Sequence, residues 1–149
     1  MNIDRLKLAS ALLREVAAKT WKVTTERDNP DSDDVDLKGV AQFNLSHWLD
    51  ESSGPHCGFS ACAVGHMCLD KRFNDLGLVM DFDWGAEGSP ALLVGEVPIE
   101  NCDHGWGAVT NFFEIGSETA RELFNDDYYE GVPGPTDVAN RIDQLIARN

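Results

Sequence analysis

The chain has 149 residues, 42% of them hydrophobic, which suits one compact domain of ordinary size over residues 1–149. Its 26 Asp and Glu residues outnumber its 12 Lys and Arg residues, so the formal net charge is −14. A surface of that charge repels DNA, RNA and anionic membranes. We therefore expect no direct binding to nucleic acid and no membrane partner.

The N-terminal segment carries charges that argue against export. Arg5, Lys7, Arg14 and Glu15 interrupt the apolar run that a secretory signal needs. No later stretch approaches the roughly 20 apolar residues of a membrane span. The sequence thus predicts a cytoplasmic protein, in which the four cysteines are free thiols or metal ligands rather than disulfides.

The first part of the chain combines an amphipathic helix with an acidic loop. Apolar residues recur at helical spacing from Ile3 to Lys19 after a suitable N-cap, Asn2, so we predict a helix within residues 1–20. The run Trp21–Thr25 favours a short strand or an extended arm. Residues 26–38 are rich in Asp but lack the turn glycine and closing glutamate of a calcium loop, so a solvated loop is preferred.

The middle of the chain is predicted to hold a helical turn, a buried helix and a hairpin. The turn of helix lies within Val40–Leu49, where aromatic and leucine side chains face the core. The helix runs from about Phe59 to Leu69 and is apolar on all sides, which indicates burial. Leu78–Trp84 and Ala91–Val97 are predicted as the two strands of an antiparallel hairpin.

Three further helices are predicted in the final third, each next to a residue that favours an N-cap. Their ranges are Gly105–Ile115, Glu118–Phe124 and Asp137–Arg148, with Asp103, Ser117 and Thr136 as the caps. The expected fold class is α+β, mainly α, with four or five helices packed with a small antiparallel β-hairpin.

Residues 56–68 gather three of the four cysteines and two of the four histidines. Cys62 and His66 are four residues apart and share one face of the predicted helix. With Cys102 and His104 from a second segment they form a possible Cys2His2 zinc site. Buried free cysteines also pack as small hydrophobic residues, and no Cys-x2-Cys pair is present. We expect no cofactor, with zinc on these four residues as the open alternative.

A nucleophilic cysteine is a second chemical alternative. Cys57 lies just before the predicted helix, where the amide dipoles favour a thiolate. His56 or His104 is a candidate base, with Asp103 or Asn101 to orient it. No recognised protease motif surrounds Cys57, so an enzyme is the less favoured interpretation.

Three other residues carry alternatives that the sequence leaves open. Asp81 and Asp83 alternate on a predicted strand, as a general acid and base do, but such pairs more often mark the wet face of a hairpin. Gly65 in a helix costs about 0.5–1 kcal/mol relative to alanine unless close packing compensates. We expect that another helix or Trp48 approaches it closely.

The segment Cys57–His66 resembles the Cys-Gly-Thr-x-x-Cys-x-x-Gly-His signature of small uncharacterised proteins encoded by bacteriophages and other mobile elements. Those proteins also have an upstream tryptophan, like Trp48, and Phe-Phe-Gly-Leu and Leu-Phe elements similar to Phe112–Gly116 and Leu123–Phe124. The resemblance covers about residues 42–146, with Phe59 in place of the usual threonine.

What the resemblance implies is a genomic setting and a shared structural feature rather than a reaction. It suits a small cytoplasmic accessory or host-takeover protein. The residues that it groups into one structural feature are Trp48, Cys57, Gly58, Cys62, Gly65 and His66.

The leading functional hypothesis is a non-enzymatic binding protein that inhibits a host nucleic-acid-processing or defence complex, because an acidic surface can compete with DNA or RNA for a basic groove. One alternative is a metal- or thiol-dependent enzyme centred on the Cys/His cluster. Another is a small-ligand sequestering protein whose pocket is lined by some of the aromatic residues Trp48, Trp84, Trp106, Phe112, Tyr128 and Tyr129. A nucleotide ligand then requires basic groups such as Lys71, Arg72 or Arg121 at the pocket. The sequence leaves the oligomeric state open.

Overall fold

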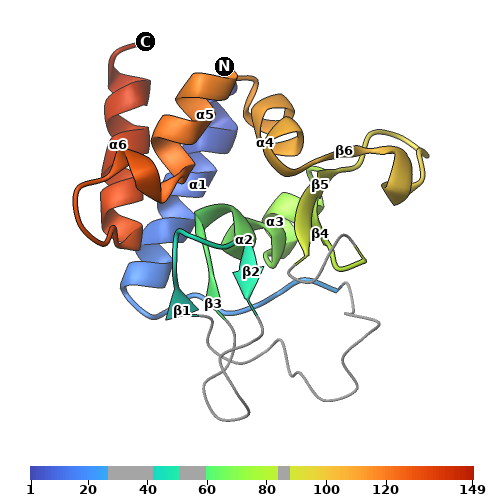
Figure 1. Cartoon of the computed structure of the whole chain (residues 1–149), viewed down its shortest axis with the longest axis horizontal. Helices are drawn as coiled ribbons and strands as arrows, with labels where there is room; N and C mark the ends of the chain where they lie inside the picture. Colours follow the sequence, from blue (N-terminus) through green and yellow to red (C-terminus); the bar gives the residue numbers. More distant parts are fainter. Residues whose placement is uncertain (27–41, 51–59, 84–87) are drawn as a thin grey trace.

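A computed structural model describes residues 1–26, 42–50, 60–83 and 88–149, and its fold is α+β, mainly α (Figure 1). This part of the chain contains six α-helices: α1 (Ile3–Ala17), α2 (Ala63–Cys68), α3 (Lys71–Asn74), α4 (Gly105–Phe113), α5 (Ser117–Phe124) and α6 (Pro135–Ala147). Its short strands are β1 (Gln42–Phe43), β2 (Leu49–Asp50), β3 (Ser60–Ala61), β4 (Leu78–Asp81), β5 (Ser89–Leu92) and β6 (Asp103–His104). None of the described helices has the length and hydropathy of a membrane span.

Helices α1 and α6 lie side by side and form one end of the molecule (Figure 1). The prediction of α1 is confirmed, because the Asn2 side chain caps it by accepting a hydrogen bond from the Arg5 amide. Its apolar stripe, which includes Leu12 and Leu13, is buried, as is Ile142 of α6. The first helix and the last therefore cover each other's apolar faces.

The arm after α1 is held by one buried carboxylate. Trp21 donates its indole N–H to Asp70 over 3.0 Å, and Arg72 donates to both oxygens of Asp70. Arg72 also forms two 2.9 Å bonds with Glu15 of α1. Thr24 and Thr25 donate their amides to one carbonyl after α2, so the segment is an extended arm rather than a strand. Residues 27–38 of the predicted acidic loop lie outside the described residues.

The helical turn predicted within Val40–Leu49 is wrong for residues 42–49, where the chain forms β1, a turn and β2. Strand β3 pairs with β1 in parallel and with β2 in antiparallel orientation. The Asn44 side chain accepts a hydrogen bond from the Ser46 amide over 3.0 Å, which favours a turn over a helix.

Helix α2 is buried on all sides, as predicted, but it is shorter than expected. Residues 60–61 form β3, so the helix begins at Ala63 with Cys62 as its N-cap instead of at Phe59. The Cys62 sulfur accepts a hydrogen bond from the Gly65 amide over 3.3 Å. A sulfur atom thus takes the place that an oxygen usually has at a helix start.

The predicted antiparallel hairpin is confirmed, with shorter strands and a third member. Strand β4 pairs with β5, which pairs with β6, and both pairings are antiparallel. All residues of β4 and β5 are buried. Apolar and polar residues therefore do not alternate along β5 as they do in a strand with one face in water. Trp84 lies outside the described residues.

The three C-terminal helices exist, but their ends differ from the predictions. Helix α4 stops at Phe113 because Glu114 adopts a left-handed conformation, with φ of 54°. Gly116 and Gly134, rather than Ser117 and Thr136, are the N-caps of α5 and α6. Four buried phenylalanines form a chain of ring contacts in the core, in the order Phe73, Phe112, Phe113 and Phe124.

Candidate functional site

Cys62 and His66, two of the predicted zinc ligands, are the N-cap of α2 and a residue within α2, and both are buried. His66 Nδ1 donates to the Cys62 carbonyl oxygen over 2.9 Å, and its ring packs edge-on against Trp21 at a centroid distance of 4.8 Å. Burial raises the pKa of the Cys62 thiol to about 12 and also raises the pKa of Cys68. Both thiols are therefore protonated at neutral pH and unsuited as nucleophiles.

Cys102 and His104, the other two predicted ligands, have different surroundings. His104 Nε2 lies 2.8 Å from Asp81 Oδ2, and its Nδ1 lies 2.8 Å from the Cys102 carbonyl oxygen. Across residues 1–26, 42–50, 60–83 and 88–149, no three His, Cys, Asp or Glu side chains are grouped as a metal site. Zinc on these four residues stays a prediction. His56, Cys57 and Gly58 lie outside the described residues.

The two carboxylates of the hairpin do not share a wet face. Asp81 is 5% exposed and is paired with His104, whereas Asp83 lies beyond the end of β4 and is exposed. The backbone amide of Asp83 donates to Asp81 Oδ1 over 3.0 Å. The wet-face interpretation is therefore wrong for Asp81, which joins β4 to β6.

Gly65 touches the backbone of Trp48, as the sequence predicted. A methyl group built at Gly65 would lie 1.8 Å from the Trp48 carbonyl oxygen and 3.0 Å from the Ala61 side chain. The Cys62 amide donates to the His47 carbonyl oxygen over 2.9 Å. The missing side chain of Gly65 and the amide of Cys62 thus fix the segment that carries Trp48.

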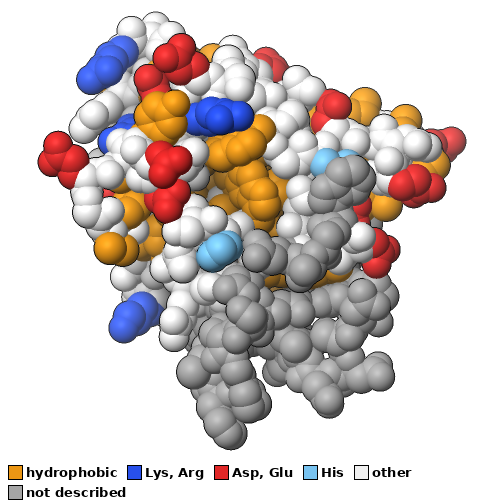
Figure 2. Space-filling view, in the orientation of Figure 1, with side chains coloured by type: hydrophobic (Ala, Val, Ile, Leu, Met, Phe, Trp, Pro, Cys, Tyr) orange, Lys and Arg blue, Asp and Glu red, His pale blue; other side chains and the backbone are white. Residues whose placement is uncertain are grey.

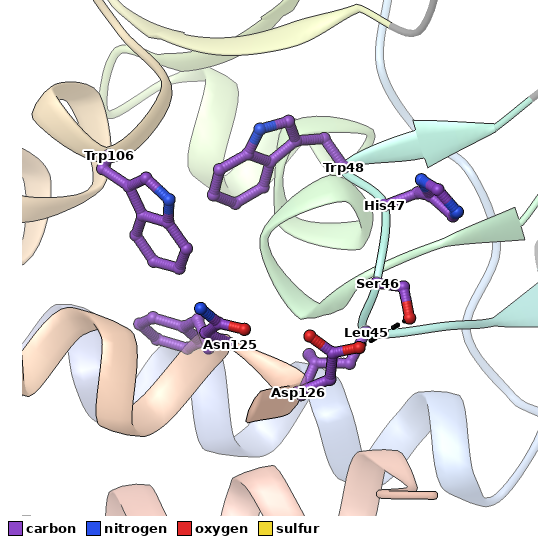
Figure 3. Close-up of a pocket in the computed structure, with 8 residues that line it drawn as sticks. Leu45, Ser46, His47, Trp48, Trp106, Asn125 and Asp126 are labelled. Atoms are coloured by element: carbon purple, nitrogen blue, oxygen red, sulfur yellow. Dashed lines mark hydrogen bonds between the residues drawn. The ribbon is translucent and has the colours of Figure 1, made fainter. Parts of the chain in front are cut away.

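This segment forms one wall of a pocket of about 260 Å³ (Figure 3). We call it the Trp pocket, and it is lined by Leu45, Ser46, His47, Trp48, Trp106, Phe124, Asn125 and Asp126. The Trp48 and Trp106 rings meet edge to face, with centroids 4.9 Å apart. In Figure 3 the two indoles lie near each other above Asn125 and Asp126, while the His47 ring points away from them. Ser46 Oγ donates to Asp126 Oδ2 over 2.7 Å and ties the two walls together.

The surroundings of the Trp pocket carry both signs of charge. The Arg121 guanidinium of α5 lies 5.6 Å from the centre of the Trp106 ring. Figure 2 shows a hydrophobic hollow in the middle of this face, with a Lys or Arg side chain above it and Asp or Glu side chains to its left. The pocket therefore offers aromatic faces, a carboxylate and a nearby cation.

No protein-family model, curated protein or solved structure matches the chain. What the Trp pocket binds has therefore to be inferred from the residues that line it.

The sequence named two of these residues and missed the others. Trp48 and Trp106 were candidates for a pocket lining, and Arg121 is the one of the three candidate basic residues that lies beside it. Lys71 is paired with Asp75 at 2.6 Å, and Arg72 with Asp70 and Glu15. Of the other candidate aromatics, Phe112 is in the core, Tyr128 is 45% exposed and Tyr129 donates to the Leu123 carbonyl. Nothing in the local sequence marks Asp126 as a pocket residue, because its side-chain partner Ser46 is 80 positions away in the sequence.

Proposed function

We propose that the protein is a non-enzymatic binding protein that inhibits a nucleic-acid-processing or defence complex by occupying a basic groove of that complex. The observation that carries the proposal is the excess of 26 acidic over 12 basic side chains. If each basic side chain were paired with one acidic side chain, 14 acidic side chains would still lack a Lys or Arg partner, and those at the surface would attract a cationic partner. The resemblance to proteins of phages and mobile elements also supports this role, and the partner would be met in the cytoplasm.

The location of the contact follows from the anatomy of protein interfaces. Interfaces are anchored by aromatic residues and arginines in central pockets, with polar residues around them. Trp48 and Trp106 provide such a pocket, Asp126 lines it, and Asp127 follows Asp126 on the same 3-10 turn after α5. We infer that this face contacts the partner.

The experiment is affinity capture from host lysate on the immobilised full chain, with heparin as the competitor for basic grooves. The proposal predicts retained proteins that heparin releases and that bind less well as salt rises. Asp126→Asn combined with Asp127→Asn is expected to weaken capture. Glu96→Gln combined with Glu100→Gln changes the net charge equally at exposed positions away from the Trp pocket and serves as the control. If nothing that heparin can release is retained, the proposal is wrong.

A small-ligand sequestering protein is a second candidate, which the lining of the Trp pocket favours. Two indoles and a neighbouring guanidinium suit a planar anionic ligand such as a nucleotide. The cavity of about 260 Å³ lies slightly below the usual range of about 300–1,000 Å³ for small-molecule sites. Its size and the net charge of −14 therefore favour a cationic side chain over a nucleotide.

A further inference from the structure

The indoles of the Trp pocket can attract a cation. The face of a tryptophan ring carries negative electrostatic potential, and guanidinium groups both stack on it and interact with it as cations. Trp106 already attracts one cation of the same chain, since the Arg121 guanidinium lies 5.6 Å from its ring centre. Trp48 lies 4.9 Å from Trp106 between ring centres, so a group that enters the pocket meets both indoles.

The carboxylate of the Trp pocket is held in place and keeps one oxygen available. Ser46 donates to Asp126 Oδ2, and in the described part of the chain no donor is hydrogen-bonded to Asp126 Oδ1. The neighbouring Asn125 accepts from the Asp127 amide over 3.1 Å, which fixes its side-chain oxygen. An incoming donor therefore meets a carboxylate whose orientation is already set, which lowers the entropy cost of binding.

These contacts select the kind of occupant. A guanidinium is planar, always charged and able to stack on an indole while it donates to a carboxylate. We propose that the Trp pocket binds an arginine side chain of the protein partner. The inference rests on the proposed function and deepens it, because it names the group by which a basic partner is anchored.

The test uses the full chain labelled with ¹⁵N and a short peptide, acetyl-Gly-Arg-Gly-amide. Binding is expected to shift the indole N–H signals of Trp48 and Trp106 in a saturable way. The same peptide with citrulline, a neutral analogue of arginine, is expected to cause no saturable shift. A lysine peptide is expected to bind more weakly because its ammonium cannot stack. Equal shifts from the arginine and citrulline peptides would overturn the proposal.

Two variants change the charge of the site in opposite directions. Asp126→Asn keeps the acceptor for Ser46 and is expected to weaken arginine-peptide binding about tenfold, which corresponds to about 1.4 kcal/mol. Arg121→Gln removes a competing cation and is expected to strengthen binding two- to threefold. Glu100→Gln, at an exposed position outside the Trp pocket, controls for net charge and is expected to change binding little.

A different set of results would show that the Trp pocket binds anions instead of arginine. If Arg121→Gln weakens binding of adenosine monophosphate, while the arginine peptide leaves the indole signals of the folded protein unchanged, the arginine proposal is wrong. Trp106→Phe keeps a ring face and Trp106→Leu removes it, so only the second is expected to abolish arginine binding in a protein that is still folded. Heparin-sensitive capture that survives in Trp106→Leu would reject the arginine anchor and leave the proposed function standing.

Discussion

Replacing Gly65 by alanine adds one methyl group where α2 packs against the backbone of the Trp48 segment. The new carbon would lie 1.8 Å from the Trp48 carbonyl oxygen, a separation that must grow to at least 3.0 Å before the contact is tolerable. Because the neighbour is backbone, the segment itself has to retreat, and the bond from the Cys62 amide to the His47 carbonyl weakens with it. The substitution therefore perturbs the Trp pocket as well as the core.

The magnitude follows from three opposing contributions. Overpacking costs about 1–3 kcal/mol, and a weakened backbone hydrogen bond costs about 1 kcal/mol. The gain in helix propensity from glycine to alanine offsets about 0.5–1 kcal/mol of this. We expect Gly65→Ala to lower the free energy of unfolding by about 1–3 kcal/mol, which for a chain of this length lowers the Tm by about 2–12 °C.

Urea denaturation followed by tryptophan fluorescence, together with a thermal melt, measures the effect. Gly107→Ala is the matched control, since it also lies in a helix but its added methyl group would meet the Asp103 Cβ at an ordinary contact distance of 3.8 Å. The control is expected to raise stability by about 0.5–1 kcal/mol. If Gly65→Ala is as stable as the wild type or more stable, helix propensity dominates and the reasoning about the Trp48 contact is refuted.

Three further predictions concern the buried carboxylate and the cysteines. Burial alone would raise the pKa of Asp70, but its hydrogen bonds with Arg72 and Trp21 and the charge of Arg72 together outweigh burial and lower the pKa; Asp70→Asn is therefore expected to cost about 1.5–3 kcal/mol at pH 7. A lowered folded pKa adds stability above the unfolded pKa of about 3.9, so the difference between wild type and variant, measured by urea denaturation, is expected to shrink as the pH falls below 4. Iodoacetamide followed by peptide mass spectrometry is expected to label Cys102 before Cys62 and Cys68, which are buried; equal rates would contradict this. Native mass spectrometry without chelator is expected to give the metal-free mass, and one zinc that is lost on denaturation would instead support the predicted Cys2His2 ligands.

The sequence was most informative where local interactions decide the structure. The Asn2 side chain caps α1 by accepting from the amide of Arg5, three residues later. The hairpin β4–β5 likewise joins segments that are close in the chain. The expectation that Gly65 needs a close neighbour was also correct, because a glycine inside a buried helix implies that space is short.

Long-range contacts decide the features that the sequence did not reveal. The two-residue strands β1 and β2 exist because β3 supplies their partners, so local propensity carries no signal for them. The Trp pocket has the same origin, since Ser46 and Asp126 meet although they are 80 positions apart in the sequence. The sequence offered Trp48 and Trp106 as candidate pocket residues because they are aromatic. It did not offer Asp126, whose place in the pocket depends on the tertiary fold.

The pairing of α1 with α6 has a consequence for how the chain is made. Helix α1 is synthesised about 120 residues before its partner α6, and at about 5–20 residues per second this interval takes roughly 6–24 s of translation. During that interval the stripe that contains Leu12 and Leu13 lacks the cover that α6 provides, and the apolar surface left open is a binding site for chaperones or a starting point for aggregation. The contact between α1 and α6 can form only after α6 has emerged from the ribosome, so this part of the core is completed late in the synthesis of the domain.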